Sequence, residues 1–163
     1  MGNAAATAES AILSYLHVYD DIEEEIEGLS VEQVKWKASP QSWSITEVLA
    51  HLVDHSIVVS FRIRDILAGS ANRLPAFDQD SWVAGQRANE ESISELLTAA
   101  RALVRYNAGL LGRLSEVDWQ RSGINAKGEP IQIAAIIPAF VSHVQSHLNQ
   151  IRRIKQQSAG KQV

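Results

Sequence analysis

The 163-residue sequence contains no cysteine, and this absence excludes several kinds of site. Without thiols the chain cannot form a disulfide, a zinc finger, an iron–sulfur cluster or a cysteine nucleophile. Any metal site must use nitrogen and oxygen ligands. A chain of this length forms one domain by default and buries enough surface to fold without disulfides or a structural metal. We expect a single domain over residues 1–163, with a polar C-terminal tail at about 157–163.

Basic surfaces and long apolar runs are also missing. Lys and Arg number 15 against 19 Asp and Glu, which gives a net charge of -4. An acidic chain with dispersed basic residues is not typical of a nucleic-acid-binding protein. No apolar run approaches the roughly 20 residues that span a bilayer, and the N-terminus does not resemble a secretory signal. We therefore expect a cytoplasmic protein whose partners are neither nucleic acids nor membranes.

Four segments have apolar residues spaced three and four apart, a pattern that predicts amphipathic α-helices. These segments span about 4–26, 44–69, 93–114 and 131–154. Ser44 is a candidate N-cap, and Glu47 three residues later completes a capping box. No segment shows the alternation and turn residues of a β-hairpin, and residues 117–130 are expected to form a loop. The predicted fold is all-α: a four-helix bundle with long interhelical connections that pack across an end of it.

Four of the five histidines form two pairs with i,i+4 spacing, His51 with His55 and His143 with His147. Random placement of five histidines would give about 0.1 such pairs. Residues four apart project from one helix face, and bundles build metal sites from facing helices. On a helical wheel His55 lies closer to the apolar face than His51 does. The alternative interpretation is that these are ordinary core-edge histidines, as we expect for His17, which has no histidine partner.

Two stretches resemble a known family. The sequence WSITEVLAHLVD at 43–54, followed by SFRIRDIL, Phe77-Asp78 and Trp82, is similar to the DinB superfamily and in particular to its YfiT-like branch. The sequence HVQSHLNQI at 143–151 looks like the HxxxHxxQI ending of that family. Chain length and helix order agree as well, so the resemblance covers nearly the whole chain.

The resemblance implies a DinB-like four-helix bundle in which His51, His143 and His147 hold a divalent metal ion. Zn and Ni are the expected metals, with Mn and Fe as alternatives. Three neutral imidazoles leave open positions on the ion, which is typical of a catalytic rather than a structural site. Pro138 lies inside the fourth predicted helix and is expected to kink it about one turn before His143.

Other side chains are expected near the ion without binding it. His55 occupies a position that the family pattern leaves variable, and both His55 and Gln150 are candidates for contacting substrate or supporting the ligands. Arg62 has two interpretations, a contact with an anionic substrate group and a salt bridge within the bundle. Asp54 is expected at the surface, because the helical wheel turns it away from the core. Three aromatic residues, Trp43, Phe77 and Trp82, are expected to pack the helix ends first and to line a pocket second.

The family resemblance also limits the function to a few candidates. It implies a metal-dependent hydrolase, or a thiol S-transferase that uses a low-molecular-weight thiol, acting on a small molecule. A thiol would have to arrive as substrate, because the chain has none of its own. The sequence leaves open a non-catalytic bundle that binds a metal or small ligand without turnover. Family members often form homodimers, and we carry that over as an expectation.

Overall fold

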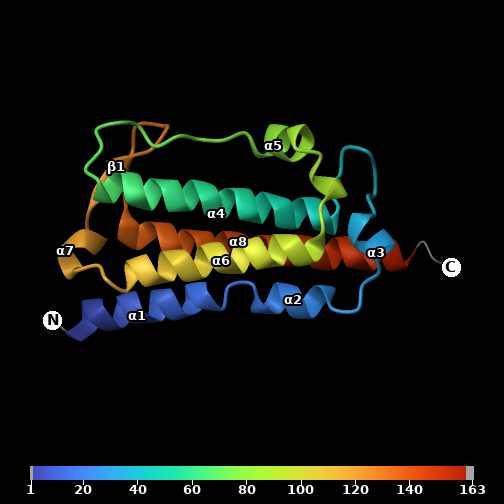
Figure 1. The fold of residues 1–163 in the computed structure, drawn as a ribbon, viewed down its shortest axis with the longest axis horizontal. Coiled ribbons are helices and arrows are strands. Elements are labelled where there is room, and N and C mark those ends of the chain that lie inside the picture. The colour runs from blue at the N-terminus through green and yellow to red at the C-terminus, as the bar shows by residue number, and fades with distance from the viewer. Residues whose placement is uncertain (1, 161–163) are drawn as a thin grey trace.

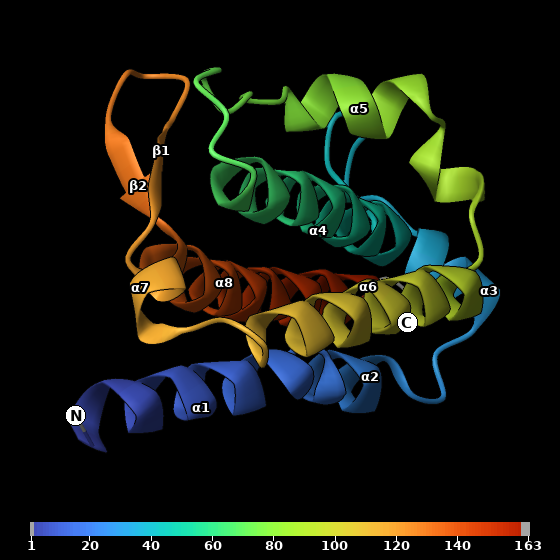
Figure 2. The ribbon, with the colours of Figure 1, turned by 60° about the vertical axis from the view of Figure 1, so that its left-hand side comes forward.

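The computed structural model describes residues 2–160, with side chains from residue 7 onward. Its long helices are α1 (Gly2–Leu16) continued by α2 (Asp20–Ile26), α4 (Ile45–Leu67), α6 (Ile93–Leu111) and α8 (Ile133–Ala159). In Figure 1, α1, α2 and α8 run in one direction and α4 and α6 in the other. The helices pack in a ring in the order α1, α6, α4, α8, as Figure 2 shows. The predicted four-helix bundle is confirmed.

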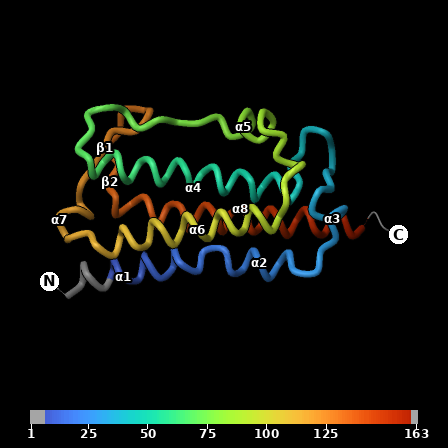
Figure 3. The backbone as a smooth tube through the Cα atoms, viewed as in Figure 1, coloured from blue at the N-terminus to red at the C-terminus, as the bar shows by residue number. Residues whose placement is uncertain are grey.

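The connection between α4 and α6 differs from the prediction. Because these two helices run in the same direction, the chain must return along the length of the bundle rather than across its end. In Figure 3 this segment, residues 68–92, follows α4 from one end to the other. It contains α5 (Gln79–Gly85) and the 3-10 turn η1 (Ala88–Glu90). The return segment therefore covers a side of α4 that the helical bundle alone would leave open.

The first predicted helix, 4–26, is wrong in one respect, because it breaks between α1 and α2. Asp20, Asp21 and Glu23 form an acidic first turn in α2, which suits the positive end of a helix dipole. The Nδ1–H of His17 donates to the Asp20 carboxylate at 2.7 Å. These features favour a new helix start at Asp20 over continuation of α1.

The connection between α2 and α4 lies at one end of the bundle, as predicted, and it contains a short helix that the prediction missed. This helix is α3 (Val31–Lys35), and Ser30 and Gln33 form a capping box at its start. The Ser30-x-x-Gln33 pattern is a known N-terminal signal, but five residues are too few for apolar periodicity to be visible.

A small β-hairpin occupies the region expected to be a loop, so the prediction of no hairpin was wrong. After α7 (Glu116–Trp119), β1 (Ser122–Ile124) pairs antiparallel with β2 (Pro130–Gln132). The backbone N–H of Leu74 donates to the Ile124 carbonyl at 2.7 Å, which ties the hairpin to the return segment. A Cβ on Gly123 would lie 2.9 Å from the Ile66 side chain on α4, so any other residue there would displace that side chain. Tertiary contacts hold strands that are too short for period-two alternation to reveal.

The last helix is longer than predicted. It continues through Pro138, which is exposed, and ends at Ala159 with Gly160 as its C-cap. Residues 157–159 of the expected tail are therefore helical, and Ser158 is buried. The remainder of that tail, 161–163, lies outside the described residues. Among residues 2–160, none of the helices is both long and apolar enough to cross a membrane.

A polar cluster in the core is centred on the buried side chain of Asn107 in α6. The Asn107 Nδ2 donates to the hydroxyl oxygens of Tyr15, at 3.0 Å, and Ser60, at 2.7 Å. Its Oδ1 accepts from the Arg64 guanidinium at 2.8 Å. All three heavy-atom contacts are within ordinary hydrogen-bond length, so this amide is fully used in joining α1, α4 and α6.

Candidate metal centre

The two histidine pairs face each other across the contact between α4 and α8. The Nε2 atom of His143 lies 3.0 Å from Nε2 of His51 and 3.1 Å from Nε2 of His147. His55 joins the cluster from α4, with its ring centroid 4.4 Å from that of His143. The structure thus brings together all four histidines that the spacing singled out. His17 lies apart, with an exposed side chain.

The wheel-based preference for His55 over His51 at the apolar face was wrong. His51 is only 1% exposed, whereas His55 is half-buried. A helical wheel assumes that one face of α4 is covered by the bundle. Here the return segment covers a further face, and its Phe77 ring packs against both His51, at 6.0 Å, and His55, at 5.8 Å. The bundle and the return segment together bury residues of α4 that its apolar face alone would place at the edge of the core.

Gln150 determines which nitrogen of His147 carries a proton. The Oε1 atom of Gln150 lies 2.8 Å from Nδ1 of His147. An amide oxygen only accepts, so Nδ1 is the donor and the Nε2 lone pair is left pointing at the cluster. A hydrogen bond of this kind orients metal-bound histidines in many proteins. Gln150 is therefore positioned to orient the His147 ring.

Two ring nitrogens in the cluster are buried without a hydrogen-bond partner. They are Nδ1 of His51 and Nδ1 of His55. Buried polar atoms in proteins are paired in the great majority of cases, so unpaired ones need a physical reason. At His51 the atom that faces the other histidines is Nε2, so Nδ1 carries the ring proton when Nε2 offers its lone pair to an ion. At His55 an ion could instead take the lone pair of the unpaired Nδ1.

The cluster holds its imidazoles in the neutral form. Burial, with a smaller contribution from repulsion by neighbouring histidines, lowers the pKa of His51 to about 3. Burial likewise lowers the pKa of His55 to about 3 and that of His143 to about 4. For His147, burial lowers the pKa while the hydrogen bond to Gln150 partly opposes that shift. Neutral imidazoles have the free lone pairs that a metal ion requires.

The spacing of the nitrogens fits ligands of a single ion. Nitrogens about 2.0–2.1 Å from one ion stand roughly 2.9 Å apart at right angles and roughly 3.3 Å apart in a tetrahedron. The two Nε2 separations at His143, 3.0 and 3.1 Å, fall between these values. Ligand atoms of His51, His55 and His143 also lie within 4.8 Å of one another. The Nε2 separations give His147 as the third member of the site, and the group of ligand atoms gives His55. Both rings pack against those of His51 and His143.

Aromatic rings enclose the histidines. Trp43 stacks on His147 with ring centroids 6.3 Å apart and lies 5.2 Å from the His51 ring. Phe77 also packs against His51, with ring centroids 6.0 Å apart, and its ring centroid lies 5.0 Å from that of Trp82. The aromatic residues were expected chiefly to pack helix ends. Trp43 and Phe77 instead line the histidine cluster directly, which lowers the polarity around it.

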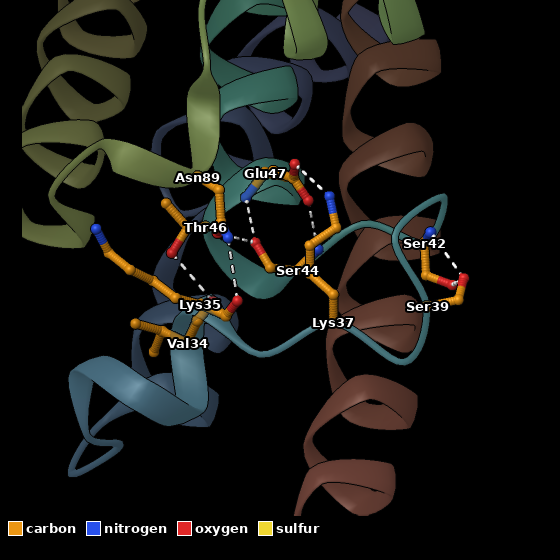
Figure 4. A network of polar contacts seen from close by, with 9 residues as sticks. All are labelled: Val34, Lys35, Lys37, Ser39, Ser42, Ser44, Thr46, Glu47 and Asn89. Atoms are coloured by element: carbon orange, nitrogen blue, oxygen red, sulfur yellow. Dashed lines mark hydrogen bonds and ion pairs between the residues drawn. The ribbon is translucent and has the colours of Figure 1, made fainter.

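A hydrogen-bond network fixes the start of α4 (Figure 4). Ser44 and Glu47 form the predicted capping box. The Ser44 hydroxyl donates to Asn89 in η1 at 2.6 Å, and the Thr46 hydroxyl donates to the Val34 carbonyl at 3.0 Å. The Lys37 ammonium donates to Glu47 at 2.8 Å. The network joins α3, α4 and η1, and so holds in place the first turns of α4, which lead to His51.

A polar pocket opens onto the cluster from the side of α8. It is a cavity of about 450 Å³ that reaches His147 and Trp43. Its other walls carry amide, hydroxyl and charged groups from the loop before α4, the start of α5 and the end of α8: Gln41, Ser42, Gln79, Asp80, Gln150, Arg153 and Gln157. Sequence reasoning missed most of these, because isolated polar residues in loops and on helix ends carry no periodic signal. A larger apolar cavity of about 660 Å³ lies between α1, α7 and the start of α8, and no histidine lines it.

Arg62 forms no ion pair with any described residue. Its guanidinium donates to the Pro75 carbonyl at 2.7 Å, and its Nε is buried without a partner. Burial lowers the pKa of Arg62. The salt-bridge interpretation is therefore wrong for the described part of the chain. Arg62 instead holds the return segment two residues before Phe77.

Asp54 is buried rather than exposed, which corrects another prediction. Its side chain is covered by the return segment, where the Gln86 amide donates to Asp54 Oδ2 at 2.6 Å. Burial raises the pKa of Asp54, and the hydrogen bond from Gln86 partly offsets this. The helical wheel was right that Asp54 points away from the bundle, but the wheel could not show that another segment lies there.

Comparison with known proteins agrees with this architecture. The family model of the DinB superfamily matches residues 15–151. A protein of Oceanobacillus iheyensis named "Putative metal-dependent hydrolase OB0413" is 24% identical over 132 residues, which cover 79% of this chain and 74% of that protein. The solved structure of YfiT from Bacillus subtilis, described as a probable metal-dependent hydrolase with an unusual four-helix bundle topology, superposes with a TM-score of 0.84. It is 17% identical, and the match covers 93% of this chain and 87% of that one. This chain belongs to the DinB superfamily.

Proposed function

We propose that this protein is a metal-dependent hydrolase of a small polar molecule, with His51, His143 and His147 as metal ligands. The observation that carries the proposal is the convergence of their Nε2 atoms, 3.0 and 3.1 Å apart, between α4 and α8. The naming of the Oceanobacillus relative as a metal-dependent hydrolase supports the same reaction class. Neutral imidazole ligands suit Zn and Ni, and Mn and Fe are less favoured alternatives.

A divalent ion at this site would supply Lewis acidity and would lower the pKa of a bound water. The protein's own residues would orient the ligands, exclude bulk water and bind the substrate. Gln150 orients His147, while Trp43 and Phe77 limit the access of bulk water to the cluster. The amide and charged groups of the polar pocket can hydrogen-bond a substrate beside His147. Arg62 and His55 are candidates for contacts with that substrate.

Thiol S-transfer is the second candidate function. The polar pocket beside His147 favours it, because its amide and hydroxyl groups can bind a polar low-molecular-weight thiol. The chain contains no cysteine, so the sulfur nucleophile would come from that cosubstrate. A neutral, partly enclosed histidine site can hold such a thiol as a thiolate when a metal is present.

The test is a turnover assay on the full chain, reconstituted with Zn or Ni. One panel contains ester and amide substrates, and a second pairs small thiols with electrophiles. We expect turnover in the first panel that is lost in His143→Ala and kept in His17→Ala, since His17 lies outside the cluster. Turnover only in the thiol panel would replace hydrolysis with S-transfer. Stoichiometric metal binding with no turnover in either panel would leave a non-catalytic metal-binding bundle.

A further inference from the structure

We propose that His55 is a fourth ligand, so that the ion is held by four imidazoles. This inference rests on the proposed metal site and extends it by one residue. Resemblance to the family assigns three histidines and leaves position 55 variable. In this chain the position carries a side chain with the right donor atom, on the same helix as His51 and four residues after it.

The distances place His55 within reach of the same ion. Ligand atoms of His51, His55 and His143 all lie within 4.8 Å of one another. Two nitrogens on opposite sides of one ion are about 4.2 Å apart, given metal–nitrogen distances of about 2.1 Å. A shift of about half an ångström, which small χ rotations provide, is then enough for all three to share an ion. His147 stands outside that group of three and has its Nε2 3.1 Å from that of His143, so its ring must also move toward the group for four imidazoles to share one ion.

Aromatic and histidine rings surround the His55 imidazole. The ring is enclosed by Phe140, at 5.3 Å, Phe77, at 5.8 Å, and His143, at 4.4 Å. Its Nδ1 is buried and has no hydrogen-bond partner. An apolar side chain would fill this space without leaving a buried polar atom unpaired. A histidine here is accounted for if the ion takes the lone pair of its unprotonated ring nitrogen.

A fourth imidazole has two consequences for the site. Nitrogen-rich sites bind Ni, Cu and Zn in preference to the hard ions Mg, Ca and Mn, so His55 narrows the choice of metal. A fourth ligand also reduces the open positions to one on a five-coordinate ion and two on a six-coordinate ion. Substrate would then approach from the polar pocket beside His147 and Trp43 rather than from the His55 side.

The test uses Co²⁺ as a spectroscopic probe of the full metal-free chain. His55→Phe is the informative variant, because it keeps a ring against Phe140 and removes both nitrogens. His17→Phe is the matched control, since that histidine is exposed and remote from the cluster. We expect His55→Phe to weaken Co²⁺ binding at least tenfold and to shift the visible absorption bands, with no change in His17→Phe. X-ray absorption should count four imidazoles in the wild type and three in His55→Phe.

Each outcome separates this inference from the proposed function. Three imidazoles in the wild-type spectrum, or Co²⁺ affinity and bands unchanged in His55→Phe, would overturn the role of His55 and leave the three-histidine site intact. A wild-type chain that binds no Co²⁺, Zn²⁺ or Ni²⁺ would overturn the metal site itself. The wild-type count needs no variant, so it decides the question even if His55→Phe does not fold.

Discussion

The bundle buries two polar clusters, one around Asn107 and one around His143, and they use their hydrogen-bonding atoms differently. Asn107 donates to Tyr15 and Ser60 and accepts from Arg64, so its amide is satisfied within the protein. The histidine cluster instead brings like atoms together. Its Nε2 nitrogens face one another at 3.0 and 3.1 Å, and two Nδ1 atoms have no partner.

Whether the buried polar atoms have hydrogen-bond partners distinguishes a structural polar cluster from a functional one in the same core. A buried network that pairs every donor with an acceptor contributes to stability and specifies packing. A buried cluster that leaves some polar atoms without partners costs free energy in the metal-free protein, and a ligand that binds only the folded chain adds stability. The two clusters should therefore respond in opposite ways to mutation, metal and pH.

The largest effect is expected for His147→Ala. Removal of a ligand should weaken Zn²⁺ or Ni²⁺ binding more than about 100-fold, because even residues that support a ligand are worth 10–100-fold. Metal should stabilise the wild type by about 4 kcal/mol at 1,000 times the dissociation constant and should not stabilise this variant. Calorimetric titration and urea unfolding with and without metal measure both. Unchanged metal stoichiometry in His147→Ala would contradict the assignment.

The opposite response is expected for Asn107→Leu. The variant leaves the Arg64 guanidinium and the Tyr15 hydroxyl without a buried partner, which should lower the free energy of unfolding by about 2–4 kcal/mol. Its metal affinity should match the wild type, since no contact joins Asn107 to the histidines. Asn149→Leu, at an exposed site on α8, is the control and should be neutral. A large loss of metal affinity in Asn107→Leu would show that the two clusters are coupled.

Acid should destabilise the histidine cluster selectively in the metal-free protein. The pKa values of His51 and His55, lowered to about 3, and of His143, lowered to about 4, compare with about 6.5 in an unfolded chain. Between these values the unfolded chain binds more protons, so stability is present above about pH 6.5 and is lost as pH falls toward 4. We expect a loss of up to about 2 kcal/mol for each of these histidines between about pH 7 and 5.

Urea unfolding at the two pH values measures this loss. Asn107→Leu should keep the full pH dependence, because it leaves the histidines in place. His143→Phe should reduce the pH dependence, since the variant removes one of the depressed groups. Equal pH dependence in wild type and His143→Phe would mean that the histidines are not the cause.

The smallest effect is expected for Gln150→Ala. Loss of the acceptor for Nδ1 of His147 frees that ring to change tautomer and should weaken metal binding about tenfold. Gln150→Glu keeps an acceptor and should retain the affinity. Gln145→Ala, at an exposed position on the same helix, is the matched control. Equal affinities in Gln150→Ala and Gln145→Ala would remove Gln150 from a positioning role.

Much of this architecture could be read from local patterns. The capping box of Ser44 and Glu47 and the i,i+4 histidine pairs depend on positions within one helix, so they are visible in sequence. The burial of Asp54, and the deeper burial of His51 than of His55, could not be predicted in the same way. Both depend on the return segment, which approaches α4 from the side that its own periodicity marks as solvent.

The sequence by itself determined the helices, the donor atoms and the absence of thiols, because spacing and composition act along the chain. Only the tertiary structure decided that α4 and α6 run in the same direction, which requires the return segment and so buries His51 and Asp54. It also decided which polar clusters are satisfied, since Asn107 meets partners 47 and 92 positions away in sequence. Pairing of buried atoms is a property of three-dimensional neighbours, and periodicity within one helix does not contain it.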